Sequence, residues 1–268
     1  MRLSSLQNPE IKRLQKLIQK SKARKESGRF VVEGKREILR AIAAGYTLEG
    51  LFIEENVILD GKTKRIFEQT GAKQYELSKN LFEKVAIRSN TIQMVALGKQ
   101  KKHPLNDLKC SSKSLVMVVE GAEKPGNIGA LLRTAAAFEW DAVLIANSKT
   151  DLYNPNVIRS SLGGLFFVPV AVASSQEILS FLKDHKFTIA TAALSANNTS
   201  SQHFDYPLPC ALVVGSEDLG VSPIWIEEAS HIVKIPMSTN IDSLNLSVSA
   251  GILMYEALSK NGLLEDSL

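Results

Sequence analysis

An uninterrupted apolar run at residues 115–119 leads into a glycine-rich loop ending at Gly126 and then into a helical pattern at about residues 127–138. A short, fully apolar run is typical of a strand buried on both faces of a parallel sheet. Strand and helix patterns continue through the C-terminal half. The expected strands are residues 142–146, 167–172, 187–193, 211–215 and 232–235, and the expected helices are residues 156–161, 176–185, 223–229 and 244–258. This alternation predicts an α/β domain with a parallel sheet.

Residues 28–98 show a shorter alternation of the same kind. The expected strands are residues 29–33, 48–54 and 91–97, and the expected helices are residues 35–44, 62–70 and 78–85. Gly45 and Gly71 follow two of these helices, where glycine commonly ends a helix. This stretch holds no histidine or cysteine, so it predicts a small α/β binding domain without chemistry of its own. A polar, basic, proline-containing linker is expected at residues 99–112, between domains at residues 1–98 and 113–268.

Composition limits the class of protein. With 44% hydrophobic and 22% charged residues, the chain has the balance of an ordinary globular protein. Cys110 and Cys210 form no CxxC pair, so we expect no zinc knuckle or disulfide and a reducing, cytoplasmic location. No apolar run nears the roughly 18 residues that span a bilayer, and no signal-peptide core follows Met1. The histidines have no metal-ligand spacing, so no metal is predicted: His103, His185, His203 and His231.

Positive charge is concentrated at the start of the chain. The net charge is +4, yet residues 1–25 carry eight basic side chains and a single acid, Glu10. Asn8 as N-cap and Pro9 as the first helical residue predict a helix with one apolar stripe and basic residues on its other faces. Two interpretations follow from the charge alone. The helix has a solvated basic face, or it is an arm that contacts nucleic-acid phosphates.

The glycine-rich loop after the first C-terminal strand is a candidate anion site, because it leads into a helix N-terminus. A P-loop requires Lys and then Ser or Thr after its last glycine, whereas Asn127 and Ile128 follow Gly126 here. The chain also contains no Gly-x-Gly, the start of the usual dinucleotide fingerprint. Both observations argue against a conventional nucleotide-phosphate site.

Three separated motifs stand where apolar runs stop. They are Asn127-Ile128-Gly129 through Arg133, then Gly215-Ser216-Glu217-Asp218-Leu219-Gly220, then Ile235-Pro236-Met237 leading to Ser243-Leu244-Asn245-Leu246-Ser247. In order and spacing they resemble the motifs of the SpoU (TrmH-like) branch of the SPOUT RNA methyltransferases, over roughly residues 113–268. The pentapeptide Phe30-Val31-Val32-Glu33-Gly34 resembles the opening of that family's N-terminal substrate-binding domain.

The resemblance implies an S-adenosylmethionine-dependent enzyme that methylates a ribose 2'-hydroxyl in structured RNA. Ribosomal RNA of the 23S type is the expected substrate, ahead of tRNA, because the added N-terminal domain is similar to those of ribosomal RNA modifiers. The implied fold is a SPOUT α/β domain with a trefoil knot, joined to a small α/β domain of ribosomal-protein-like, RNA-binding fold. The implied assembly is a homodimer formed through the C-terminal domain, without membrane attachment.

The resemblance also implies the site residues. Those expected to catalyse the reaction or position the substrate are Arg133, Asn127, Glu217, Ser243 and Asn245. Those expected to bind S-adenosylmethionine are Leu194, Gly215, Ile235, Met237 and Leu244. With an RNA substrate, the phosphate-contacting interpretation of the basic helix is favoured, and the expected RNA contacts are Arg159, Lys12, Arg13, Lys16 and Arg24.

Two positions qualify the implied mechanism. Arg133 keeps its proton, so it suits stabilisation of a developing alkoxide and an adjacent phosphate better than the role of general base. Thr239 stands where the family usually has glycine, two residues beyond Met237, so we expect the backbone of this loop or its fit to RNA to differ.

Three alternatives remain at the level of sequence. The first is methylation of tRNA by the same chemistry. The second is a non-catalytic RNA-binding or assembly factor that keeps the fold but binds no S-adenosylmethionine. The third is a small-molecule α/β enzyme that holds a phosphate in the glycine-rich loop and is indifferent to RNA.

Overall fold

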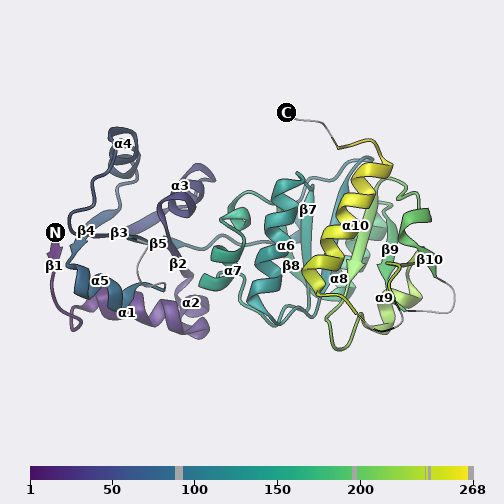
Figure 1. Ribbon diagram of the computed structural model, residues 1–268, viewed down its shortest axis with the longest axis horizontal. Coiled ribbons are helices and arrows are strands. Elements are labelled where there is room, and N and C mark those ends of the chain that lie inside the picture. The colour runs from purple at the N-terminus through teal and green to yellow at the C-terminus, as the bar shows by residue number, and fades with distance from the viewer. Residues whose placement is uncertain (88–92, 195–197, 239, 241–242, 265–268) are drawn as a thin grey trace. The chain divides into compact units, whose positions relative to one another are not determined.

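The computed structural model describes residues 1–87, 93–194, 198–238, 240 and 243–264, and its contacts divide the chain into two compact units (Figure 1). The N-terminal unit comprises Met1–Lys102 and Asp151–Phe167, and the C-terminal unit comprises His103–Thr150 and Val168–Leu268. Among the described residues, no helix combines the length and the apolar composition that crossing a membrane requires.

In the described residues of the N-terminal unit, a five-stranded sheet has the order β1-β4-β3-β5-β2. The strands are β1 (Arg2–Leu3), β2 (Arg29–Glu33), β3 (Leu48–Glu54), β4 (Lys73–Leu77) and β5 (Met94–Lys99). β1, β4 and β3 are parallel, and β5 is antiparallel to β3 and β2. β2 and β3 confirm their predicted bounds, and the expected start of β5 at residues 91 and 92 lies outside the described residues. The sequence analysis missed β1 and β4, which are short and partly exposed.

Helices cover both faces of this sheet. They are α1 (Pro9–Gln19), α2 (Ser21–Ser27), α3 (Lys35–Ala43), α4 (Gly61–Gln69) and α5 (Lys79–Val85), with α1 and α5 on one side and α3 and α4 on the other (Figure 1). α1 begins as predicted, because the Asn8 side chain accepts a hydrogen bond from the backbone N–H of Glu10 at 2.9 Å. Ile11 and Leu14 of α1 are fully buried in the core beneath the sheet.

The segment Asp151–Phe167 packs within the N-terminal unit through an aromatic cluster. The ring of Tyr153 lies 5.2 Å from that of Phe30, and Phe166 lies 4.9 Å from Tyr46. The hydroxyls of Tyr46 and Tyr153 are 3.2 Å apart, and burial raises the pKa of both phenols. The segment forms α7 (Pro155–Ser160) and a 3-10 turn η2 (Gly164–Phe166). The strand expected at residues 167–172 is therefore shorter at its start, since the chain is still turning at Phe167.

The C-terminal unit confirms the predicted parallel sheet. In its described residues seven strands have the order β10-β12-β9-β11-β6-β7-β8, and every pairing is parallel. They are β6 (Leu115–Glu120), β7 (Ala142–Ala146), β8 (Val170–Ala173), β9 (Thr188–Ala192), β10 (Thr199–Ser200), β11 (Cys210–Val214) and β12 (His231–Lys234). β6, β7 and β11 are buried along their whole length, which explains their uninterrupted apolar sequences.

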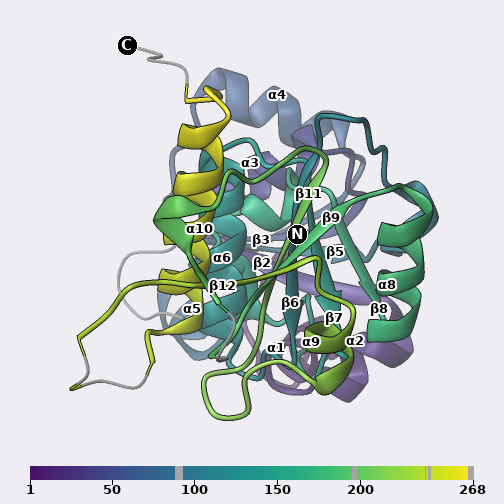
Figure 2. The ribbon, with the colours of Figure 1, turned by 90° about the vertical axis from the view of Figure 1, so that its right-hand side faces the viewer.

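Two layers of helices enclose this sheet. α6 (Pro125–Ala137) and α10 (Leu246–Lys260) lie on one side, and α8 (Ser175–Asp184) and α9 (Pro223–Glu227) lie on the other (Figure 2). Short 3-10 turns occur at η1 (Leu105–Asp107) and η3 (Ser201–His203). α6 begins two residues before the predicted start, so Asn127 lies in its first turn. α10 begins after Asn245, whose side chain caps the helix by accepting from the backbone N–H of Ser247.

Candidate active site

A cavity of about 440 Å³ opens in the C-terminal unit where β9, β11 and β12 end. The ends of parallel strands are the usual ligand-binding edge of an open α/β sheet, and this volume is in the range of small-molecule sites. The five residues expected to bind the cofactor all line it: Leu194, Gly215, Ile235, Met237 and Leu244. The structure thus brings together residues from three separated segments of the chain.

The loop after β11 requires glycine at its first position. A Cβ atom on Gly215 would lie 2.0 Å from the backbone carbon and oxygen of Gly220. The loop closes on itself because the N–H of Ser216 donates to the Gly220 carbonyl at 3.1 Å, and the N–H of Gly220 donates back to Ser216 at 2.9 Å. Gly220 has a φ of +66°, a conformation that favours glycine. This closure shapes one wall of the cavity.

Apolar side chains line the cavity although they face solvent. Leu194 is 67% exposed, Leu219 82% and Ile226 39%. Large apolar side chains exposed together at a concave surface mark a ligand site more often than a defect of packing. Apolar walls beside the open ends of strands fit a heteroaromatic ring whose polar edge meets backbone groups. The residues present therefore fit the nucleoside part of S-adenosylmethionine.

Glu217 connects the three sequence motifs. Its Oε1 accepts hydrogen bonds from the Asn127 side chain at 2.9 Å, the Asn245 side chain at 2.7 Å and the backbone N–H of Leu246 at 3.3 Å. Asn245 also donates to Asn127 Oδ1 at 3.2 Å. Lys124 Nζ donates to the other oxygen, Oε2, at 2.7 Å. We call this cluster the Glu217 network. It ties the N-terminal ends of α6 and α10 to the loop after β11.

The network holds Glu217 as a carboxylate. The hydrogen bonds from Lys124 and from the Leu246 backbone lower the pKa of Glu217. The hydrogen bond between Lys124 and Glu217 also raises the pKa of Lys124. Sequence reasoning did not single out Lys124. The only signal in the sequence is a cation directly before Pro125 at the start of a helix, which is common on surfaces.

Arg133 and Ser243 lie outside the Glu217 network. Arg133 is exposed on α6, six residues and so nearly two helical turns beyond Asn127. Within the described part of the chain, its guanidinium has no ion pair and no hydrogen bond. Ser243 lines the cavity just before α10. Arg133 is thus available to a ligand, whereas Asn127 and Asn245 are engaged in holding the loops.

A second carboxylate, Glu120, supports the same loop from beneath. It is the last residue of β6 and is 6% exposed. Its oxygens accept from the backbone N–H of Ser222 at 2.6 Å, the Ser222 hydroxyl at 2.8 Å and the Ser175 hydroxyl at 2.5 Å. Burial raises the pKa of Glu120, but these hydrogen bonds outweigh it and the net shift is downward. Glu120 was not among the predicted site residues, although an acid directly after an apolar strand is a visible signal in the sequence.

The basic helix presents only part of its expected surface. Lys12 and Lys16 are exposed on α1, whereas Arg13 donates to Glu49 at 2.7 Å. The expectation that Arg24 contacts RNA is wrong in this structure, because the residue is 2% exposed. Its Nε donates to Asp151 at 2.6 Å, and its Nη1 donates to the Leu17 and Ile18 carbonyls at 2.6 and 3.0 Å. A guanidinium so enclosed is a structural group of the N-terminal unit.

Two further predicted positions complete the site residues. Arg159 lies half-buried in the last turn of α7, in the N-terminal unit, and its side chain makes no hydrogen bond or ion pair with the rest of the described chain. Thr239, the departure from the family glycine, lies outside the described residues.

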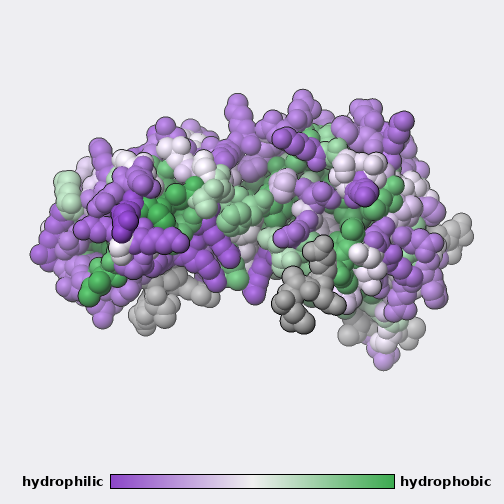
Figure 3. Space-filling view, turned by 90° about the horizontal axis from the view of Figure 1, so that it is seen from above, coloured by the Kyte–Doolittle hydropathy of each residue, from purple (hydrophilic) through white to green (hydrophobic). Residues whose placement is uncertain are grey.

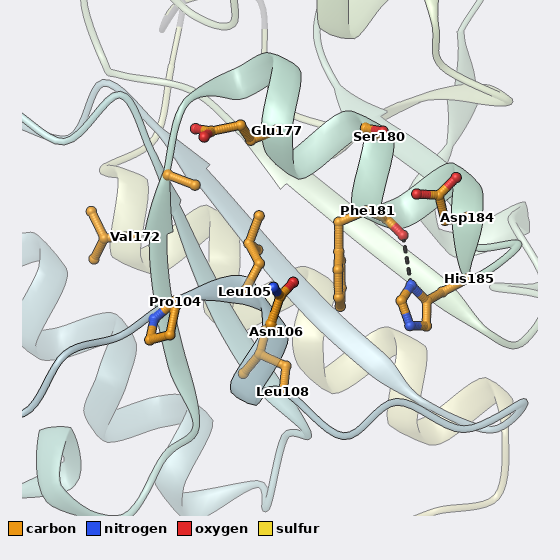
Figure 4. A pocket seen from close by; sticks show the side chains of 11 residues that line it. Pro104, Leu105, Asn106, Leu108, Val172, Glu177, Ser180, Phe181, Asp184 and His185 are labelled. Atoms are coloured by element: carbon orange, nitrogen blue, oxygen red, sulfur yellow. Dashed lines mark hydrogen bonds between the residues drawn. The ribbon is translucent and has the colours of Figure 1, made fainter.

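A larger cavity, about 750 Å³, lies between η1 and α8 (Figure 4). Two of its polar groups serve the helix itself: Glu177 completes a capping box with Ser174, and His185 Nδ1 lies 2.9 Å from the Phe181 carbonyl (Figure 4). None of the three motifs contributes to it. No cluster of metal-ligating residues was found here or elsewhere in the chain's described ranges. The cavity at the ends of β9, β11 and β12 is therefore the stronger candidate.

Comparisons with known proteins match both parts of the chain. The family described as SpoU rRNA Methylase matches residues 114–255, and the MRM3-like substrate binding domain matches residues 8–96. The first match contains the motifs of the Glu217 network and the whole cavity, and the second contains most of the five-stranded sheet.

Characterised relatives match along nearly the whole chain. The 23S rRNA (guanosine(2553)-2'-O)-methyltransferase RlmP of Bacillus subtilis is 26% identical over 94% of this chain and 97% of its own. A solved RNA 2'-O ribose methyltransferase is 36% identical, with a TM-score of 0.84 over 98% of this chain and 100% of that one. An AdoMet-bound rRNA methyltransferase from Sinorhizobium meliloti has a TM-score of 0.90 at 24% identity, covering 99% of both chains, so it shares the fold.

Proposed function

Because this chain belongs to the SpoU rRNA Methylase family, we propose that it transfers a methyl group from S-adenosylmethionine to a ribose 2'-hydroxyl of structured RNA. One observation carries the proposal: three separated motifs meet in the Glu217 network beside the cavity of about 440 Å³. The C-terminal unit carries out the reaction, and the N-terminal unit, which includes residues 151–167, binds the substrate RNA. The C-terminal segment threads through a neighbouring loop to form the family's knot.

S-adenosylmethionine supplies an electrophilic methyl group on a sulfonium. Leu194, Ile235 and Leu244 would hold its adenosine part, and Gly215 allows the close approach of the Gly220 backbone that shapes the cavity wall. A ribose hydroxyl is a weak nucleophile, so the enzyme must align it and stabilise the charge that develops on it. As the oxygen takes the methyl group, the hydroxyl proton passes to the adjacent phosphate or to water, and the sulfonium is left as a neutral thioether. Alignment of two reactants contributes about 7–11 kcal/mol in well-oriented systems.

Arg133 stabilises the developing alkoxide and holds the phosphate next to it. Arginine is a fixed cation with several N–H donors and no acceptor, so Arg133 acts by charge and by hydrogen-bond donation rather than as a base. Asn127, Asn245 and Glu217 position the helix N-termini and the loop after β11, and Ser243 faces the ligand from the cavity wall. Rigid support of this kind keeps the reacting groups within the narrow range that transfer requires.

The substrate is ribosomal RNA of the 23S type. RlmP, which matches along 94% of this chain, is a 23S rRNA methyltransferase, and residues 8–96 match a substrate binding domain. Exposed Lys12 and Lys16 on α1 supply charge for phosphates. Cys110 and Cys210 are both free, in keeping with work in the cytoplasm.

The enzyme acts as a homodimer through α6 and α10. α10 exposes Val248 at 49% and Tyr255 at 53%, and the Tyr255 ring lies 6.2 Å from that of Phe138 at the end of α6. Exposed apolar side chains on neighbouring helices favour association with a second copy. Arg133 is exposed on α6 as well, so a dimer formed here would bring a partner chain toward the reacting groups.

The test is methylation with S-adenosylmethionine labelled on its methyl group. Unmodified 23S-type rRNA and tRNA transcripts are offered separately, and the products are digested to nucleosides. We expect label in a 2'-O-methylnucleoside from rRNA and a large loss with Arg133→Ala. Arg65→Ala, which removes an exposed arginine of α4, is the matched control and should retain activity. Label only in tRNA would show that the substrate is tRNA rather than rRNA. Failure of the protein to bind S-adenosylmethionine would refute the proposal.

A further inference from the structure

A third concave surface lies on the N-terminal unit, beside α3. It is a cavity of about 470 Å³, and the described residues that line it are all basic or apolar: Lys35, Arg36, Leu39, Arg40, Ala43 and Phe167. We call this surface the Phe167 patch. On the side of the molecule where α3 lies, Figure 3 shows hydrophobic side chains exposed among hydrophilic ones on the N-terminal unit. Neither the Glu217 network nor the predicted cofactor residues contribute to it.

Phe167 is exposed although its neighbour is not. Phe166 is 6% exposed and packs against Phe30 and Tyr46 at ring distances of 5.7 and 4.9 Å. Phe167 turns the other way and is 51% exposed. The aromatic core is therefore complete without Phe167. A large apolar ring that serves no core and lies in a cavity is a candidate for ligand contact.

Arg40 is fixed over this ring. Its guanidinium carbon lies 5.9 Å from the Phe167 centroid, and its Nη1 donates to the Leu162 carbonyl. Leu162 and Gly163 both have left-handed backbone, with φ of +52° and +80°. A Cβ on Gly163 would lie 3.1 Å from Arg40 Cδ, so glycine leaves room for the arginine stem. A strained turn thus holds an aromatic face and a cation together.

The two other cations are readily available to a phosphate. Lys35 pairs with Asp60 at 2.5 Å and Arg36 pairs with Glu37 at 2.7 Å, and the Lys35 and Arg36 side chains are 46% and 55% exposed. The Lys35–Asp60 pair is exposed on both sides, so exchanging its carboxylate for a phosphate oxygen costs little. Arg36 keeps Glu37, whose side chain is 12% exposed, and offers a phosphate its remaining N–H donors. Arg40 has a carbonyl partner and, in the described residues, no carboxylate partner.

We propose that the Phe167 patch holds an unpaired nucleotide of the substrate RNA, with the base stacked on Phe167 and the flanking phosphates facing Lys35, Arg36 and Arg40. Aromatic faces beside cations are the common means of holding unstacked bases, whereas a duplex keeps its bases paired and unavailable. The inference rests on the proposed function for the identity of the ligand as RNA. It assigns a specific contact with single-stranded RNA to Phe167, a residue that belongs to none of the sequence motifs.

The test uses Phe167→Trp as a reporter of stacking. Trp140 and Trp225 are 3% and 0% exposed, so the introduced indole dominates any change caused by a ligand at the surface. We expect quenching of its fluorescence by a single-stranded RNA oligonucleotide and much less by the same strand annealed to its complement. Equal quenching by both, or none by either, overturns the proposal.

Affinity provides the second measurement. Phe167→Ala should weaken binding of single-stranded RNA about tenfold, as loss of one stacked base does, with S-adenosylmethionine affinity unchanged. Ile58→Ala, which trims a side chain that is 95% exposed in the same unit, is the control and should bind as the wild type. If Phe167→Ala leaves the RNA affinity unchanged, or changes self-association instead, the Phe167 patch is not an RNA-binding site. Failure of the wild type to methylate any RNA bears on the proposed function alone, since stacking is read without turnover.

Discussion

At the scale of single residues, two carboxylates organise the candidate active site in different ways. Glu217 is at the surface and connects Asn127, Asn245 and Lys124. Glu120 is buried and joins the loop at Ser222 to the rest of the fold. The sequence identified Glu217 because it lies in a motif. It did not identify Glu120, whose importance comes from partners far along the chain.

Replacement of Glu120 by glutamine should destabilise the fold. The amide nitrogen of glutamine would face a hydroxyl or backbone donor at a place where a carboxylate oxygen now accepts. We therefore expect the free energy of unfolding, measured with urea at pH 7, to fall by about 1–3 kcal/mol. Because the folded pKa of Glu120 is lowered, its contribution is present above the ordinary value of 4.5 and is lost as pH falls through the folded pKa. The gap between wild type and variant should therefore narrow in acid.

Glu123→Gln is the control for this experiment. Its carboxylate pairs with Lys149 at 2.5 Å, but both side chains are about 60% exposed, so the pair contributes little. If Glu123→Gln lowered the free energy of unfolding as much as Glu120→Gln does, the effect would come from loss of a negative charge rather than from loss of buried hydrogen bonds.

Gly215→Ala should abolish cofactor binding. The added methyl group would meet the Gly220 backbone at 2.0 Å, so the loop must open and the cavity wall must move. Calorimetric titration with S-adenosylmethionine should show no binding, while the wild type binds. Gly61→Ala is the matched control, because a Cβ there has nothing within 4 Å and alanine suits the start of α4. Retained affinity in Gly215→Ala would mean that the loop shape is not needed.

At the scale of elements, α1 shows why a helical pattern alone does not assign function. Its apolar stripe, which includes Ile11 and Leu14, is buried as the sequence predicts. The same basic composition extends into α2, where Arg24 faces inward to meet Asp151. Charge in the sequence therefore marks the exposed Lys22 and Lys25 of α2 but not the buried Arg24. The difference comes from a carboxylate more than a hundred residues away.

The exposed lysines of α1 should contribute to RNA affinity through phosphate contacts. Changing Lys12 and Lys16 together to glutamine should weaken RNA binding and reduce the slope of log affinity against log salt by about 1 to 2. Filter binding over a range of salt concentrations measures both. The matched control replaces Lys62 and Lys64 of α4, which are also exposed and give the same change of charge. Equal effects of the two pairs would indicate net charge rather than a defined arm.

Strands were predicted well where burial on both faces leaves an unbroken apolar run, as in β6, β7 and β11. β4 was missed because it is exposed at three of its five positions and so carries little apolar signal. β8 was placed too early because the two phenylalanines before it suggest a strand. In the fold, one of them enters the aromatic cluster and the other faces solvent.

At the scale of the whole molecule, the exposed apolar side chains of α10, which packs beside α6, should make the protein a dimer. The wild type should sediment at about twice the chain mass of 29.3 kDa. Val248→Asp with Tyr255→Asp should give a monomer with reduced methylation, because two charges would be buried in an apolar interface. Ile58→Asp places a charge on an exposed apolar residue of the N-terminal unit and should leave the mass unchanged. A monomeric wild type would contradict the proposed dimer.

The sequence by itself determined the parallel α/β character of the C-terminal half and the positions of three motifs at the ends of apolar runs, since local burial and turn chemistry are written in adjacent residues. Only the tertiary structure decided which side chains meet. Glu217 reaches Asn127 because their two segments, 90 residues apart in sequence, are adjacent in the fold. Arg24 is buried because Asp151, 127 residues later, lies against it. Such partners depend on strand order and segment packing, which no local pattern encodes.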